Sequence, residues 1–194
     1  MTLTIPTMLT LFRILLIPVL VVVFYLPYAW TNVAAAAIFV VGALTDWLDG
    51  WIARRYGMYS AFGAFLDPVA DKLMVAVALV ITVQYHHTIW MALWASVIIG
   101  REIAVSALRE WMAELGQRAK VAVATVGKVK TIVQMVALGC LLYREPLLGI
   151  PVFLVGEWLL AAAAILTLWS GFEYARAAWP VLRSEETKGV DSQG

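Results

Sequence analysis

Long uncharged runs constrain this chain more than any other feature. Residues 14–45 and 73–100 contain no Asp, Glu, Lys or Arg, whereas about 20 apolar residues are enough for one helix to cross a bilayer. Of the 194 residues, 63% are hydrophobic and 14% are charged, while a soluble domain is about half apolar and about a quarter charged. The sequence therefore predicts an integral membrane protein and argues against a soluble fold.

Each long run is interrupted in its middle by residues that favour a turn. Pro27 and Asn32 interrupt the first run, and the polar residues 84–87 interrupt the second. A third pair follows, although the uncharged residues 131–143 are too few to span unless their helix begins near Ala119. The last helix extends over residues 150–179. We expect an all-α protein of six transmembrane helices, arranged as three hairpins.

The distribution of basic residues predicts the orientation. The expected turns at residues 27–32 and 85–88 contain no Lys or Arg, and the third contains only Arg144. Because basic residues near helix ends are retained in the cytoplasm, both termini are predicted to be cytoplasmic, in a cell inner membrane. We expect one membrane domain over residues 1–182 and a disordered polar tail over residues 183–194. The net charge of +1 gives no indication of nucleic-acid binding.

Four aspartates lie in or beside the apolar segments. Asp46 and Asp49 are three residues apart, and Asp67 and Asp71 are four apart, so each pair projects from one face of a helix. Carboxylates in apolar segments are costly unless they are paired, protonated or bound to a cation. Oxygen ligands select magnesium, calcium or manganese over zinc, and magnesium or manganese also bridges phosphates. A proton or cation relay in a transporter is the alternative for such acids.

The full spacing favours the metal interpretation. It reads Asp46, two residues, Asp49-Gly50, two residues, Ala53-Arg54, eight residues, Gly63, three residues, Asp67, three residues, Asp71. This pattern resembles the signature of the CDP-alcohol phosphotransferase family at every position. The resemblance implies six transmembrane helices, a site for two divalent ions, a CDP group bound between helices at the cytoplasmic face, and release of CMP.

The resemblance also implies a role for each signature residue. It suggests metal ligation by all four aspartates, Asp46, Asp49, Asp67 and Asp71. Asp71 is in addition the implied general base, a role that suits a carboxylate beside the acceptor hydroxyl. Gly50, Ala53 and Gly63 leave room for the nucleotide, and Arg54 contacts its phosphates.

The amino-terminal residues 5–13 resemble the entry segment of the same family. Asparagine often stands in the family at the places of Thr4 and Thr7, so this chain departs from the pattern there. Thr10 and Arg13 match the pattern, and the resemblance implies that both contact the CDP group. The alternative is that Thr10 begins a helix and that Arg13 is an interfacial anchor.

Basic residues on the fourth and fifth helices indicate the acceptor. Residues 67–72, 101–116 and 127–131 resemble the bacterial members that use sn-glycerol 3-phosphate and form phosphatidylglycerol phosphate, and the resemblance implies a homodimer. A phosphorylated alcohol is a dianion and requires cations near the metal site. The candidates are Arg101, Arg109, Lys128 and Lys130.

The sequence leaves open other roles for some of these basic residues, and a second possible acceptor. Arg101 can instead pair with Glu102 or Glu157. Arg118 and Lys120 are better explained by the excess of basic residues on the cytoplasmic side. Inositol phosphate is a second anionic alcohol that similar cations would bind.

Overall fold

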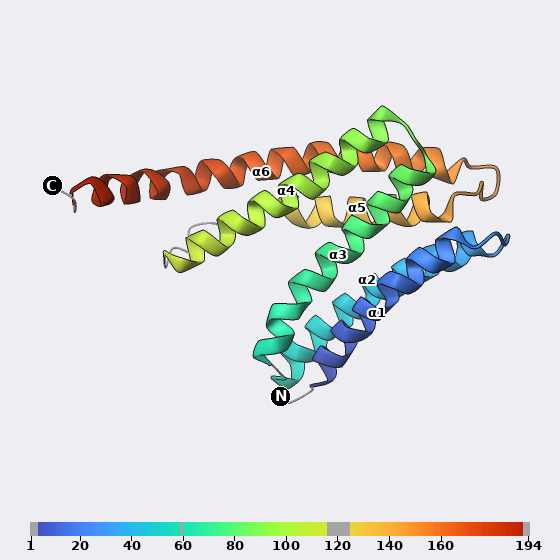
Figure 1. Ribbon diagram of the computed structural model, residues 1–194, viewed down its shortest axis with the longest axis horizontal. Coiled ribbons are helices and arrows are strands. Elements are labelled where there is room, and N and C mark those ends of the chain that lie inside the picture. Colours follow the sequence, from blue (N-terminus) through green and yellow to red (C-terminus); the bar gives the residue numbers. More distant parts are fainter. Residues whose placement is uncertain (1–3, 59, 116–124, 192–194) are drawn as a thin grey trace.

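The computed structural model describes residues 4–58, 60–115 and 125–191. These residues form six α-helices and no named strand, which confirms the predicted all-α class (Figure 1). The helices are α1 (Ile5–Tyr25), α2 (Thr31–Tyr56), α3 (Ala61–Tyr85), α4 (Ile89–Glu114), α5 (Thr125–Tyr143) and α6 (Val152–Asp191).

Local signals explain where the helices begin and end. Gly57, with φ of +66°, ends α2 in the left-handed conformation that glycine adopts without strain. Three residues later the Ser60 hydroxyl accepts a 2.9 Å hydrogen bond from the Gly63 amide and caps α3. The Thr88 hydroxyl caps α4 in the same way, accepting from the Met91 amide at 3.2 Å. The short α2–α3 connection therefore keeps the last turns of α2 next to the first turns of α3.

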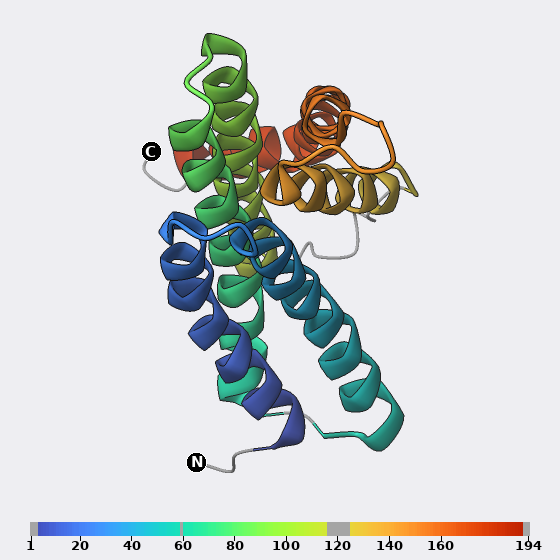
Figure 2. The same cartoon turned by 90° about the vertical axis from the view of Figure 1, so that its right-hand side faces the viewer.

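The chain makes three hairpin turns at one end of the molecule. In Figure 1 the connections from α1 to α2, from α3 to α4 and from α5 to α6 all lie toward the right, and both termini lie away from them. In Figure 2, turned by 90°, α1 and α2 lie in the lower part of the view, the α3–α4 hairpin reaches the top, and α5 and α6 lie to the right, where α5 packs directly against α2. This arrangement matches the expected three hairpins, while the orientation of the termini across the membrane stays a prediction.

Four of the described helices are long and apolar enough to cross a membrane. They are α1, α2, α4 and the segment Val152–Trp179 of α6. The apolar part of α5, Val129–Tyr143, is shorter than these spans. The predicted start of the fifth helix near Ala119, and the basic residues Arg118 and Lys120, lie outside the described residues. The chain is a multi-pass membrane protein.

Small side chains allow the helices to pack closely. Ala78, Ala137 and Ala164, on three different helices, are fully buried. Leu79 and Leu138 fill the space between them. Close approach through small residues is the usual basis of helix packing in membranes, where lipid offers no hydrophobic driving force.

α6 continues beyond the apolar segment as far as Asp191. In this respect the structure differs from the disordered tail that the sequence predicts over residues 183–194. Glu, Arg and Lys are good helix formers and can extend a helix without an apolar face. The division of the chain at residue 182 stays a prediction.

Candidate active site

Three of the four signature aspartates converge at the junction of α2 and α3. Asp46 and Asp49 from α2 and Asp67 from α3 each offer a carboxylate oxygen, and these oxygens lie within 4.8 Å of one another. Asp71, one turn further along α3, is not in this group within the described part of the chain. It still interacts electrostatically with Asp46 and Asp67.

A buried arginine from α1 pairs with all three carboxylates of this acidic group. Arg13 has a side chain that is 1% exposed, and its Nη1 lies 2.8 Å from Asp46 and 3.3 Å from Asp67. Its Nη2 donates to Asp49 Oδ2 at 2.5 Å. The guanidinium thereby offsets the desolvation of the three carboxylates. The partners of Arg13 in the structure are therefore the aspartates. The contact of Arg13 with the CDP group, which the resemblance implies, stays a prediction.

The acidic group fits a divalent metal by the chemistry of its donors. All three ligands are carboxylate oxygens, the type that magnesium and manganese prefer. The oxygens already lie close together on two helices whose ends are joined by a short turn. Asp46, Asp49 and Asp67 therefore provide a donor set that fits a divalent metal.

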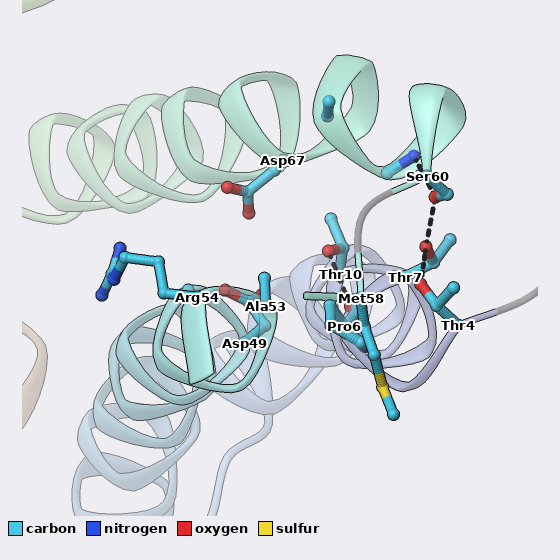
Figure 3. A pocket seen from close by; sticks show the side chains of 13 residues that line it. Thr4, Pro6, Thr7, Thr10, Asp49, Ala53, Arg54, Met58, Ser60 and Asp67 are labelled. Carbon is cyan, nitrogen blue, oxygen red and sulfur yellow. Dashed lines mark hydrogen bonds between the residues drawn. The ribbon is translucent and has the colours of Figure 1, made fainter. Parts of the chain in front are cut away.

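A pocket of about 260 Å³ opens beside the acidic group (Figure 3). The first turns of α1, the last turns of α2 and the start of α3 enclose it. Five of the six predicted CDP-binding residues line it: Thr10, Gly50, Ala53, Arg54 and Gly63. We call this pocket the nucleotide pocket, after the role predicted for its lining residues. Asp49 and Asp67 face each other at one end of it, and the Arg54 side chain extends away from the threonines. The structure thus brings most of the signature together in one place.

Three hydroxyls on the wall of this pocket were not singled out as site residues from the sequence. The Thr4 and Thr7 hydroxyls are hydrogen-bonded at 2.9 Å, and Thr7 is hydrogen-bonded to Ser60 at 2.8 Å (Figure 3). A Cβ atom on Gly63 would lie 2.7 Å from Thr7 Oγ1 and 2.8 Å from Ser60 Oγ. Gly63 therefore permits the close approach of α1 to α3, besides lining the pocket. Ser60 belongs to the residue types that are favoured at helix N-termini, and this was the available signal for its capping role.

A second cavity, of about 390 Å³, lies between α3, α4 and α5. We call it the acceptor cavity. Its polar lining consists of Asp71, Lys72, Glu102, Lys130, Thr131 and Gln134. Lys130 is 3% exposed and its ammonium group donates to Glu102 at 2.5 Å. Among the predicted acceptor-binding cations whose side chains the structure describes, Lys130 is the one that lines this cavity together with Asp71.

The other predicted cations occupy different positions. Arg101 donates to Glu102 at 3.2 Å and to the Ser170 hydroxyl at 3.0 Å. Among the described residues it lies behind Glu102 and is not part of the cavity lining. Arg109 is exposed, with its guanidinium carbon 6.0 Å from the centre of the Tyr174 ring. Lys128 belongs to α5, but its side chain lies outside the described residues.

The expected alternative pairing of Arg101 is thus partly confirmed. Its partner is Glu102, whereas Glu157 lies 3.0 Å from the His86 ring nitrogen. Glu102 accepts from both Arg101 and Lys130, so the three groups form one partly buried network. The sequence does not single out Glu102 as the residue that holds Lys130 in place.

The chain is a helical membrane protein with an acidic group and two cavities lined in part by its aspartates, and it belongs to the CDP-alcohol phosphatidyltransferase family, a family of transferases. The profile of that family matches residues 3–169. A protein of Salmonella choleraesuis (strain SC-B67) is 56% identical over 174 residues, which cover 90% of this chain and 94% of that protein. Proteins of Shigella flexneri and Escherichia coli (strain K12) are 57% and 56% identical over the same shares. All three are named CDP-diacylglycerol–glycerol-3-phosphate 3-phosphatidyltransferase.

Proposed function

We propose that this protein transfers a phosphatidyl group from CDP-diacylglycerol to sn-glycerol 3-phosphate, a phosphatidylglycerophosphate synthase activity that serves phospholipid biosynthesis. The observation that carries the proposal is the position of two aspartates on α3. Asp67 lines the nucleotide pocket and Asp71 lines the acceptor cavity. The two are about one helical turn apart, which suits a reaction between ligands bound on either side.

The residues suggest how the transfer proceeds. A hydroxyl oxygen of the acceptor forms a bond to the phosphorus of the phosphatidyl group, and the phosphoanhydride bond to CMP breaks, with CMP taking the electron pair. The hydroxyl proton passes to the Asp71 carboxylate as the new bond forms. Two magnesium or manganese ions, when bound by Asp46, Asp49, Asp67 and Asp71, would neutralise charge on the phosphates. In the proposed arrangement Gly50, Ala53, Arg54, Gly63 and Thr10 hold the CDP group.

The acceptor cavity supports an anionic acceptor. Lys130 is buried there with Glu102 as its partner, and Arg101 supplies a second cation to the same carboxylate. A phosphate arriving at this network would gain a charge-assisted contact from Lys130 while Arg101 still neutralises Glu102. A serine acceptor, a zwitterion without net charge at neutral pH, would gain less from this cation than a dianionic phosphate does. Arg101, Arg109 and Lys128 remain proposed contributors to glycerol phosphate binding.

Replacing Lys130 by Met should raise the KM for glycerol 3-phosphate roughly 10- to 100-fold, since a hydrogen bond to a charged group contributes about 1.5–3 kcal/mol. The KM for CDP-diacylglycerol should change little. Arg176→Met is the matched control, because Arg176 is exposed on α6, lines neither cavity, and its replacement should leave both constants nearly unchanged. Initial rates with each substrate varied in turn give both constants. A larger increase in the KM for CDP-diacylglycerol would refute the assignment of Lys130.

The proposal includes the cellular setting. The nucleotide pocket lies at the end of α1 and α2 opposite the α1–α2 turn (Figure 1). With both termini in the cytoplasm, this end faces the water-soluble acceptor and releases CMP there. We propose a location in the inner membrane, with the active site facing the cytoplasm, and a homodimer.

A panel of acceptors tests the proposed function. Purified protein receives CDP-diacylglycerol and magnesium with glycerol 3-phosphate, inositol phosphate or serine, and released CMP and lipid products are measured. We expect CMP release only with glycerol 3-phosphate. Turnover with inositol phosphate alone would preserve the chemistry but refute the acceptor.

A further inference from the structure

One side chain in the acceptor cavity has a polar atom for which the protein supplies no partner. Gln134 on α5 lines the cavity and is 5% exposed. Its amide oxygen is buried, and in the described part of the chain no group donates a hydrogen bond to it. A buried acceptor of this kind is destabilising unless a ligand or water satisfies it. The position therefore indicates a bound group that carries a hydrogen-bond donor.

The neighbours of Gln134 suggest what kind of ligand supplies that donor. Lys130 precedes Gln134 by four residues, so both lie on the same face of α5. Asp71, on the α3 wall of the cavity, interacts electrostatically with Lys130. The acceptor cavity thus combines a cation, a carboxylate and a neutral amide. A ligand that matches all three has an anionic group, a hydroxyl that loses its proton, and a further neutral hydrogen-bonding group.

We propose that Gln134 binds the hydroxyl of the acceptor that does not react, and that it thereby selects phosphorylated polyols over phosphorylated alcohols with a single hydroxyl. This inference rests on the proposed function and adds a specificity residue to it. The phosphate of glycerol 3-phosphate binds Lys130, one hydroxyl meets Asp71, and the second donates to the Gln134 amide oxygen. A hydroxyl can both donate and accept, so it also satisfies the amide group if the oxygen and nitrogen are exchanged.

An acceptor that lacks only the second hydroxyl provides the test. 3-Hydroxypropyl phosphate keeps the phosphate and a primary hydroxyl and has no secondary hydroxyl. The wild-type protein should show a kcat/KM for glycerol 3-phosphate that is roughly 10- to 100-fold higher than for this analogue, because the analogue leaves the amide unsatisfied. In Gln134→Leu the ratio should fall to within about threefold, since neither acceptor then has a polar partner there. The KM for CDP-diacylglycerol should be unchanged.

Two further variants make the result decisive. Val136→Ala changes a neighbouring residue that is 51% exposed and should keep the wild-type ratio. Gln134→Met, which has a similar length and shape, replaces Gln134→Leu if the latter accumulates poorly. The inference would be overturned if a Gln134 variant retained the wild-type ratio. It would also be overturned if neither the wild-type protein nor the variant turned over the analogue. A wild-type ratio near one would overturn it as well. A wild-type protein that does not use glycerol 3-phosphate refutes the proposed function itself, and the inference with it.

Discussion

Replacing Asp71 by Asn is expected to reduce kcat by roughly 10²- to 10⁴-fold, the usual contribution of a positioned general base. The amide has nearly the same shape as the carboxylate, so the packing of α3 should be preserved. Asp71 lines the acceptor cavity and lies outside the group of three aspartates among the described residues. CDP-diacylglycerol should therefore still bind.

The measurement combines steady-state rates with equilibrium binding of CDP-diacylglycerol to the purified variant. Glu110→Gln, which removes an exposed carboxylate from α4, controls for the loss of one negative charge. A tenfold increase in magnesium separates the two roles proposed for Asp71. Extra metal should restore a variant that has only lost a ligand, but it cannot replace a base. Unchanged turnover in Asp71→Asn would rule out the role of base.

Removal of divalent metal is expected to abolish turnover, and Asp49→Asn should reduce it by roughly 10³-fold, since the charge on the transferred phosphates is then no longer neutralised. Asp49 is the most buried member of the acidic group, with 3% exposure, and it accepts from Arg13 at 2.5 Å. Its replacement removes a proposed metal ligand and leaves Arg13 with only two carboxylates.

Activity after chelation, and after addition of magnesium, manganese, calcium or zinc, provides the first readout. Binding of manganese, followed by electron paramagnetic resonance, provides a second that does not depend on turnover. Magnesium or manganese should restore the wild-type rate, and Asp49→Asn should bind manganese more weakly. Full activity in excess chelator, or restoration by zinc alone, would contradict the proposed metal site.

The helices and the acidic group could be predicted because their signals are local. The uncharged runs are longer than one membrane span, and turn-forming residues divide them. A spacing of three residues places Asp46 and Asp49 on one helix face. The short connection from Gly57 to Ser60 then brings Asp67 to the same place. Each of these steps involves residues within a few turns of one another.

The position of Arg13 could not be predicted in the same way. Arg13 is 36 residues from Asp49 in the sequence, and their hydrogen bond exists only because α1 packs against α2 and α3. Sequence alone cannot distinguish a guanidinium that contacts carboxylates from one that contacts phosphates, because both are bound by the same hydrogen-bond geometry. The resemblance to the family therefore identified the residue but not its neighbours.

The acceptor cavity shows the same limit more strongly. Lys130 and Arg101 were predicted as cations near the site, but the ion pair of Lys130 with Glu102 joins α5 to α4 and depends on the three-dimensional arrangement of the helices. Gln134 has no charge and lies in an apolar segment, so its type and spacing give no signal. Its importance follows only from burial and from the missing partner of its amide oxygen.

The most direct test of the transferase account is the mass balance of a single reaction in sealed vesicles. Purified protein is reconstituted with CDP-diacylglycerol and magnesium, and glycerol 3-phosphate labelled in its phosphate is added on the side of the nucleotide pocket. We expect label to enter the lipid as phosphatidylglycerol phosphate with one CMP released for each lipid formed. Accumulation of labelled solute inside the vesicles without CMP release would contradict this account and support a transporter.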